Sequence, residues 1–262
     1  MEIAFEAIGI EIGNESLFND LTENVGKRGE VSRLARKSGT LHGKCLKLGE
    51  GLEVWSVLYE SANGELVFSD CRPAFRARFA QKITPWVLSE FTKDAENVIH
   101  GFLENSETEV LFELQNLTEV GTKIFERKVL NVGLCGLAYR AEIIENSDKK
   151  FWRAFDEVAL NVISEENDWS LCGEVIAFEP LKNSFSGKDL FWIHLDIGEF
   201  KLEILVNQTA IAAEKLKVGA FLRADVWLQG HIFDEKAKRK LYEGVDWKVE
   251  TVDFWKLFKK PN

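Results

Sequence analysis

The sequence has little proline, methionine and cysteine. Four prolines in 262 residues argue against long disordered or polyproline segments. One methionine beside eight tryptophans and nineteen phenylalanines indicates a core built on rigid aromatic side chains. The cysteines are too far apart for a CxxC redox pair or a zinc knuckle, so we expect reduced thiols buried in strands. They are Cys45, Cys71, Cys135 and Cys172.

The sequence also lacks any segment that addresses a membrane. No apolar run approaches the roughly 20 residues that cross a bilayer. Acidic residues stand near the start, where a signal peptide needs basic ones. We therefore expect a soluble cytoplasmic protein. Walker A, GxGxxG, GxSxG and HExxH patterns are missing too, and the sequence predicts no cofactor.

Positive charge is scarce in the first two thirds of the chain. The formal net charge is −10. Residues 1–167 carry 28 acidic and 19 basic side chains, whereas residues 168–262 carry 15 and 14. A phosphate backbone would be repelled by the first part and hardly attracted by the second, so a nucleic-acid partner is disfavoured.

Residues 1–166 are expected to form an α+β domain dominated by antiparallel strands. Residues 2–12 alternate between apolar and acidic or small side chains, which predicts a first strand. Asn14 precedes apolar residues spaced by three and four, which predicts a capped amphipathic helix to Val25. Further helices are predicted at 88–99 and 149–163. Strands are predicted at 40–48, 51–60, 65–69, 74–84, 99–103, 109–117, 123–132 and 135–144.

Residues 168–262 are expected to form a second domain, a small OB-like β-barrel. Strands are predicted at 171–178, 190–197, 200–206, 220–232 and 240–252, with a short helix at 209–216. A helix between the third and fourth of five strands is typical of that barrel. The polar, turn-rich residues 164–168 mark the boundary. No internal repeat is visible in the sequence.

The chemically richest face belongs to two strands of this second domain. Alternation with period two puts these side chains on one face of each strand. We expect them to form an exposed ligand-binding surface, in which two tryptophans stack and polar groups donate and accept hydrogen bonds. The alternative is a solvated sheet face whose charges pair across strands. The residues are Trp192, His194, Arg223, Asp225, Trp227, Gln229 and His231.

Other side chains offer weaker hypotheses. His194, Asp196, Glu203 and His231 have metal-ligand chemistry but no ligand spacing, and we predict no metal site. Arg76 and Arg78 share a face and could hold a phosphate or carboxylate. Internal salt bridges are the more economical prediction for arginines in so acidic a region.

Two short stretches resemble a family of uncharacterised bacterial proteins, a domain of unknown function found mainly in Firmicutes. They are Phe5-Glu6-Ala7-Ile8-Gly9, and Val226-Trp227-Leu228-Gln229-Gly230 after Val218, Gly219 and Phe221. The resemblance implies a bacterial cytoplasmic protein and carries no catalytic residue.

The sequence therefore favours a non-enzymatic binding or protein-interaction module. Its partner would be a protein or a small molecule, and the apolar residues Phe254, Trp255, Leu257 and Phe258 leave a homodimer contact open. The alternative is a hydrolase or lyase that uses histidine and carboxylates in a cleft between the two domains, so enzymatic activity stays an open question.

Overall fold

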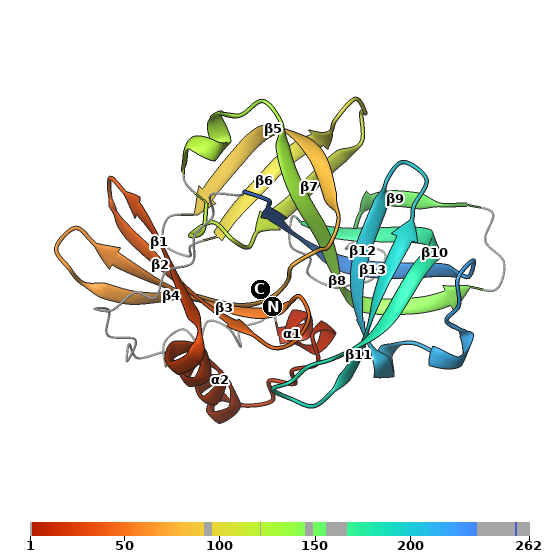
Figure 1. Cartoon of the computed structure of the whole chain (residues 1–262), viewed down its shortest axis with the longest axis horizontal. Coiled ribbons are helices and arrows are strands. Elements are labelled where there is room, and N and C mark those ends of the chain that lie inside the picture. Colours follow the sequence, from red (N-terminus) through yellow and green to blue (C-terminus); the bar gives the residue numbers. More distant parts are fainter. Residues whose placement is uncertain are drawn as a thin grey trace.

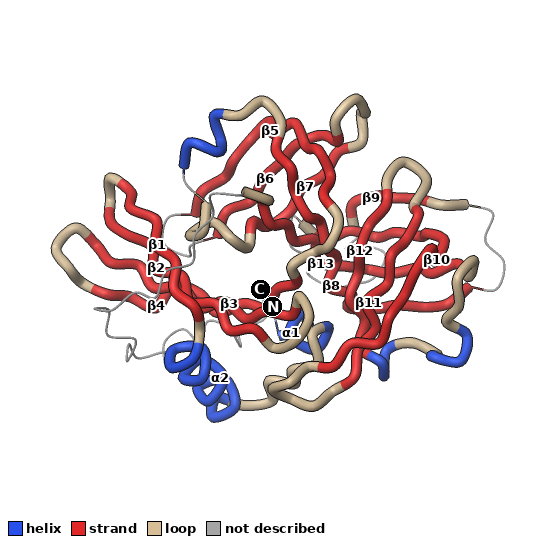
Figure 2. The backbone as a smooth tube through the Cα atoms, viewed as in Figure 1, coloured by secondary structure: helices blue, strands red, loops and turns tan. Residues whose placement is uncertain are grey.

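The protein is mostly β-structure, as Figure 1 shows for the computed structural model. The structure describes residues 2–91, 96–120, 122–144, 149–155, 167–234 and 255. One sheet has four antiparallel strands in sequential order, and the other has nine strands with mixed directions. Figure 2 shows how strands dominate the described backbone. No helix in the described ranges is long and apolar enough to cross a membrane.

The four-stranded sheet follows two helices at the start of the chain. The helices are α1 (Glu2–Ala7) and α2 (Glu15–Arg28), and the strands are β1 (Glu30–Arg36), β2 (Gly39–Lys47), β3 (Leu52–Ser61) and β4 (Leu66–Phe75). Helix α2 begins as predicted, because the side chain of Asn14 accepts a hydrogen bond from the backbone of Leu17. The β3–β4 hairpin turns at Gly64, whose φ of 84° suits glycine.

The predicted strand at residues 2–12 is wrong, because this segment begins with α1. Ala4, Phe5 and Ile8 are fully buried, and they also lie at helical spacing. Helix α1 contacts β4 of the first sheet and β8 and β12 of the second. The helix therefore fills the space where the two sheets meet, as Figure 1 shows.

The nine-stranded sheet holds the rest of the described chain. Its strands are β5 (Ala80–Phe91), β6 (Glu96–Leu103), β7 (Glu109–Leu114), β8 (Leu130–Ile144), β9 (Phe151–Ala154), β10 (Asp168–Lys182), β11 (Asp189–Asp196), β12 (Lys201–Asn207) and β13 (Phe221–Ile232). Three short 3-10 turns accompany them, η1 (Thr122–Glu126), η2 (Gln208–Ala210) and η3 (Ala213–Lys215).

Strand pairing in this sheet closes into two rings. One runs β10–β11–β12–β8–β13 and back to β10. The other runs β5–β6–β7–β13–β8 and back to β5. Each ring has one parallel pairing, β12 with β8 or β7 with β13, and its other pairings are antiparallel. The pairing pattern is thus a structural repeat that the sequence does not display, and β8 and β13 belong to both rings.

Several local predictions are corrected by this pairing. Residues 88–91 and 96–99 lie in strands β5 and β6 instead of a helix, and residues 122–126 form η1 instead of a strand. The described part of the predicted helix at 149–163 holds a strand at Phe151–Ala154, which pairs with β10, and residues 156–163 lie outside the described residues. In place of the predicted helix at 209–216 the chain forms the two 3-10 turns η2 and η3. The predicted strand at 240–252 lies outside the described residues.

The two-domain division near residue 166 stays a prediction. Strand β8 precedes that boundary and β13 follows it, and the two pair along their length from Phe221 to Ile232. Most of the predicted boundary segment lies outside the described residues.

Buried polar contacts join the two sheets. Arg72 of β4 is 2% exposed and forms ion pairs with Asp70, at 3.0 Å, and with Glu113 of β7. Gln229 of β13 donates a hydrogen bond of 2.8 Å to the carbonyl of Pro73. Such buried groups are costly unless they are satisfied, so these contacts fix the relative position of the sheets.

Candidate functional site

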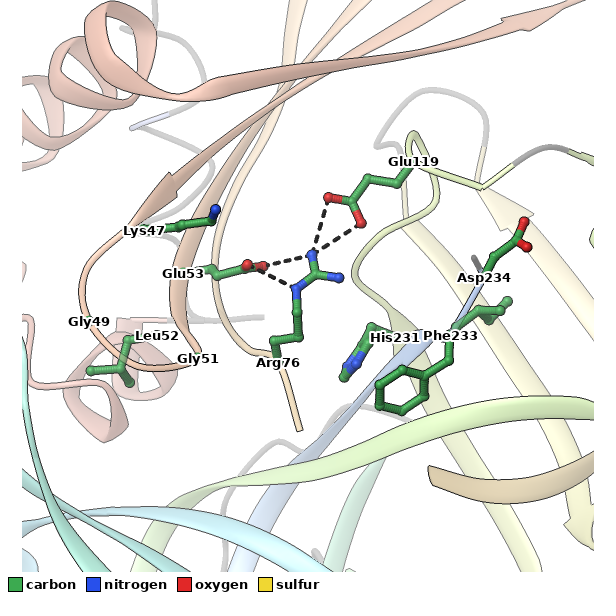
Figure 3. Close-up of a pocket in the computed structure, with 11 residues that line it drawn as sticks. Lys47, Gly49, Gly51, Leu52, Glu53, Arg76, Glu119, His231, Phe233 and Asp234 are labelled. Carbon is green, nitrogen blue, oxygen red and sulfur yellow. Dashed lines mark hydrogen bonds and ion pairs between the residues drawn. The ribbon is translucent and has the colours of Figure 1, made fainter. Parts of the chain in front are cut away.

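A pocket of about 540 Å³ opens where the two sheets meet (Figure 3). This volume is in the range of small-molecule sites, about 300–1,000 Å³. The lining comes from the β2–β3 loop, β3, the segment after β4, the turn after β7, and the end of β13. The residues are Lys47, Gly49, Gly51, Leu52, Glu53, Arg76, Glu119, His231, Ile232, Phe233 and Asp234.

Arg76 is fixed between two carboxylates on one wall of the pocket. Its Nε and Nη2 atoms donate to Glu53 at 3.0 and 3.2 Å, and Nη2 lies 3.1 Å from both oxygens of Glu119. In Figure 3 the other terminal nitrogen points away from both carboxylates, towards the side where His231 and Phe233 lie. The paired guanidinium is thereby held in one orientation.

Each of the two carboxylates is itself positioned by a neighbour. Trp55 donates its indole N–H to Glu53 at 3.1 Å, and the side-chain amide of Asn116 donates to Glu119 at 3.3 Å. Glu53 and Glu119 are 4% and 8% exposed, so their charges act at close range in a partly desolvated site. These contacts hold the three side chains in one arrangement, so the pocket loses less conformational entropy when a ligand binds.

Asn116 holds the end of β13 at the pocket. Its side chain accepts from the backbone N–H of Ile232 at 2.9 Å and donates to the carbonyl of the same residue at 3.0 Å. These two hydrogen bonds satisfy the backbone N–H and carbonyl groups of Ile232, as a neighbouring strand would do. It places His231 and Phe233, whose rings lie 4.6 Å apart, beside Arg76.

The opposite rim is the loop between β2 and β3. Gly51 has a φ of 72°, and a Cβ atom there would lie 2.6 Å from the ring of Phe75. The carbonyl of Gly51 accepts from the backbone N–H of Arg76 at 2.8 Å. Glycine is therefore required for the close approach that brings the loop to the arginine.

The charge of the described lining is slightly negative. Glu53, Glu119 and Asp234 oppose Lys47 and Arg76. Leu52, Ile232 and Phe233 supply apolar surface. This lining suits a neutral or positively charged molecule that has an acceptor for Arg76 and an apolar part for Phe233.

The structure scatters the seven residues that the sequence singled out. Only His231 lines the pocket, and the nearby Gln229 bonds to Pro73. Arg223 precedes His231 by eight positions on β13, about 26 Å along an extended strand. Asp225 accepts a hydrogen bond of 2.6 Å from Ser170. No single surface therefore unites these side chains.

The expected exposure of this face is wrong for most of its members. Trp192, Trp227, Gln229 and His231 are 6% exposed or less, and His194 is 9% exposed. The physical reason is that other elements cover the face that alternation was expected to expose to solvent. These elements are the four-stranded sheet, α1 and the segment after β4. Both tryptophans belong to one buried apolar cluster with Phe5, Ile8 and Leu137.

Trp192 and His194 lie together under the segment that joins the sheets. The guanidinium of Arg78 lies 4.2 Å from the centre of the Trp192 ring, and Phe79 stacks on His194 at 4.7 Å. Glu203 accepts the indole N–H of Trp192 at 2.6 Å and the backbone N–H groups of Arg78 and Phe79, each at 2.8 Å. This cluster anchors residues 78–79.

Burial changes the acidity of two groups in this cluster. Desolvation raises the pKa of Glu203, against its three hydrogen-bond donors and the charge of Arg78. Desolvation and the charge of Lys201 lower the pKa of His194. The four cysteines are buried, and burial raises the pKa of Cys71 and Cys135 well above the ordinary value. These thiols are therefore poor nucleophiles.

The arginines expected to form internal salt bridges do so. Arg76 pairs with Glu53 and Glu119, and Arg78 pairs with Glu179 at 2.8 Å. Sequence reasoning identified neither the two carboxylates nor Phe233 as pocket residues. Their shared location was not visible, because they come from separate segments with no common pattern.

Within the described residues, no group of three or more histidine, cysteine, aspartate or glutamate side chains is placed to hold a metal ion. A scan against protein-family models matches no family, and searches of curated proteins and of solved structures find no match.

Proposed function

We propose that the protein is a non-enzymatic binding protein whose pocket between the two sheets holds a small polar molecule. The observation that carries this proposal is the fixed Arg76, which Glu53 and Glu119 hold at the wall of a pocket of about 540 Å³. An oxygen atom of the ligand would accept a hydrogen bond from the guanidinium of Arg76. The lining has one more carboxylate than it has basic side chains, and this negative charge disfavours phosphorylated ligands. An apolar or aromatic part would pack on Phe233.

The strand order supports a finer description of the fold. The ring β10–β11–β12–β8–β13 has five strands, and short 3-10 turns lie between β12 and β13, which would be the third and fourth strands if β8 were counted last. We infer an OB-like barrel, in which β8 takes the fifth position that the sequence assigned to residues 240–252. The likeness to uncharacterised bacterial proteins, with a cytoplasmic location, remains part of this proposal.

A ligand screen by thermal shift tests the pocket. Candidate molecules that raise the unfolding temperature of the full chain would be measured again with Arg76→Lys and Glu119→Gln. Arg78→Lys is the matched control, since both arginine side chains are 30% exposed and only Arg76 lines the pocket. Stabilisation should be lost in the first two variants and kept in the control. Equal stabilisation of all three would refute a ligand site at Arg76.

The second candidate is a hydrolase or lyase, and one observation favours it. His231 lies on the same pocket lining as Glu53 and Glu119, which are the residue types of general acid–base catalysis. Turnover of a pocket ligand that is abolished in His231→Gln, with binding retained, would place this activity first. Binding without turnover supports the non-enzymatic function.

A further inference from the structure

A second surface, separate from the pocket, lies on strands β5, β6 and β7. Trp86 is 69% exposed, the highest value among the exposed large apolar side chains that the structure describes. Its ring lies 5.4 Å from that of His100 and 6.0 Å from that of Phe102. Val87 beside it is 44% exposed. None of these residues lines the pocket, and we call the four of them the aromatic patch.

A distortion of the strand brings Trp86 and Val87 onto the same exposed face. Pro85 pairs with Gly101 and Val87 with His100, so Trp86 is an extra residue, a β-bulge without a partner in the β5–β6 register. A bulge turns a side chain out of the regular alternation. As a result Trp86 and Val87, though adjacent, are both exposed.

Gly101 makes this bulge sterically feasible. A Cβ atom at that position would lie 2.6 Å from the carbonyl oxygen of Thr84 and 3.1 Å from the Cα atom of Pro85. The distortion is therefore built into the strand pair by glycine on one strand and proline on the other. It adds Val87 to the face on which alternation from the buried Ile83 already places Trp86.

The segment that carries the patch is strongly acidic. Residues 80–112 contain six carboxylates and two lysines, a net charge of −4. Phe102 lies opposite Glu109 in the β6–β7 register. Glu109 pairs with His100, and Glu104 pairs with Lys82 at 3.1 Å. Glu107 is exposed in the turn between these strands.

We propose that the aromatic patch is the docking site for a basic segment of a protein partner, with an arginine or lysine side chain stacked on the ring of Trp86. Tryptophan is the best aromatic acceptor for a cation, and arginine stacks on its face most often. The carboxylates Glu104, Glu107 and Glu109 would pair with further basic residues of the segment. The negative field of the chain would accelerate the encounter. The same field repels a nucleic-acid backbone, which could also use an aromatic surface.

Calorimetric titration of the full chain with a capped hexa-arginine peptide tests this site. We expect binding that weakens as ionic strength rises, and a loss of roughly tenfold in affinity in Trp86→Ala. Phe185→Ala is the matched control for removal of an exposed aromatic ring, since Phe185 is 39% exposed and lies in the loop between β10 and β11. The control should bind as tightly as the native chain.

Position-specific electrostatics is tested with two triple variants of equal charge. Glu104→Gln, Glu107→Gln and Glu109→Gln together should weaken binding at least tenfold. The same change at the exposed residues Glu11, Glu65 and Glu214, which lie outside the segment, should change the affinity about twofold or less. Circular dichroism would verify that each variant is folded.

Three outcomes would overturn the proposal. They are no binding at low ionic strength, equal losses in the two triple variants, and tighter binding of single-stranded oligothymidylate than of the peptide. None of them bears on the pocket, because the aromatic patch and the pocket share no residue.

Discussion

Removal of the Glu203 carboxylate should destabilise the protein by about 3 kcal/mol. Three donors converge on this side chain, which is 2% exposed: the backbone N–H groups of Arg78 and Phe79 and the indole N–H of Trp192. An orphaned buried donor costs about 1–3 kcal/mol. For Glu203→Ala we take about 1 kcal/mol for each of the three donors. The lower value applies because the variant no longer pays the cost of burying a carboxylate, which offsets part of the loss.

Urea unfolding with linear extrapolation would measure the change in unfolding free energy. Glu179→Ala is the matched control. Glu179 also contacts Arg78, at 2.8 Å, but its side chain is 53% exposed, and an exposed ion pair contributes about 1 kcal/mol or less. If Glu203→Ala costs no more than this control, residues 78–79 are not anchored by the buried carboxylate and the reasoning fails.

Three further predictions concern single positions. Because burial raises the folded-state pKa of Glu203 above its ordinary value of 4.5, the native chain loses unfolding free energy as the pH rises through that raised value. The destabilisation caused by Glu203→Gln should therefore be larger at pH 4 than at pH 7, and urea titrations that show the opposite trend would contradict this sign. Asn14→Ala removes the cap that accepts from Leu17 and should cost about 1 kcal/mol in the same assay, whereas an unchanged midpoint would show that the cap is dispensable. Gly101→Ala should cost about 1–3 kcal/mol through its clash with Thr84, and a neutral effect in thermal unfolding would mean that the bulge relaxes freely.

Sequence patterns predicted the elements whose stability is local. Helix α2 shows apolar spacing of three and four behind Asn14, and the β3–β4 hairpin carries Asn63-Gly64. Both features depend on neighbours along the chain, so a single sequence displays them. The strand at Phe151–Ala154 was missed because its helical spacing is overruled by pairing with β10.

The candidate site could be predicted only in fragments. Sequence reasoning anticipated that Arg76 pairs with carboxylates, but Glu53 and Glu119 are recruited from strand β3 and from the turn after β7. Alternation on β13 grouped Trp227 with His231, although the first is in the core and the second lines the pocket. Alternation along a strand predicts on which face of the sheet a side chain lies. Whether that face is exposed to solvent depends on the elements that pack over it, and these cannot be read from the strand itself.

The two shared strands also set an order of events during synthesis. Strand β8 leaves the ribosome before β13, with which it forms its longest pairing, and β13 ends only at Ile232. Neither ring can close before β13 has been made. The backbone N–H and carbonyl groups at the edge of β5, β6 and β7 therefore stay unpaired while about a hundred further residues are translated. A ribosome-bound chain that stops before Phe221 should therefore be sensitive to proteolysis throughout the nine-stranded region and should engage chaperones. Completion of one late strand would then protect both halves together.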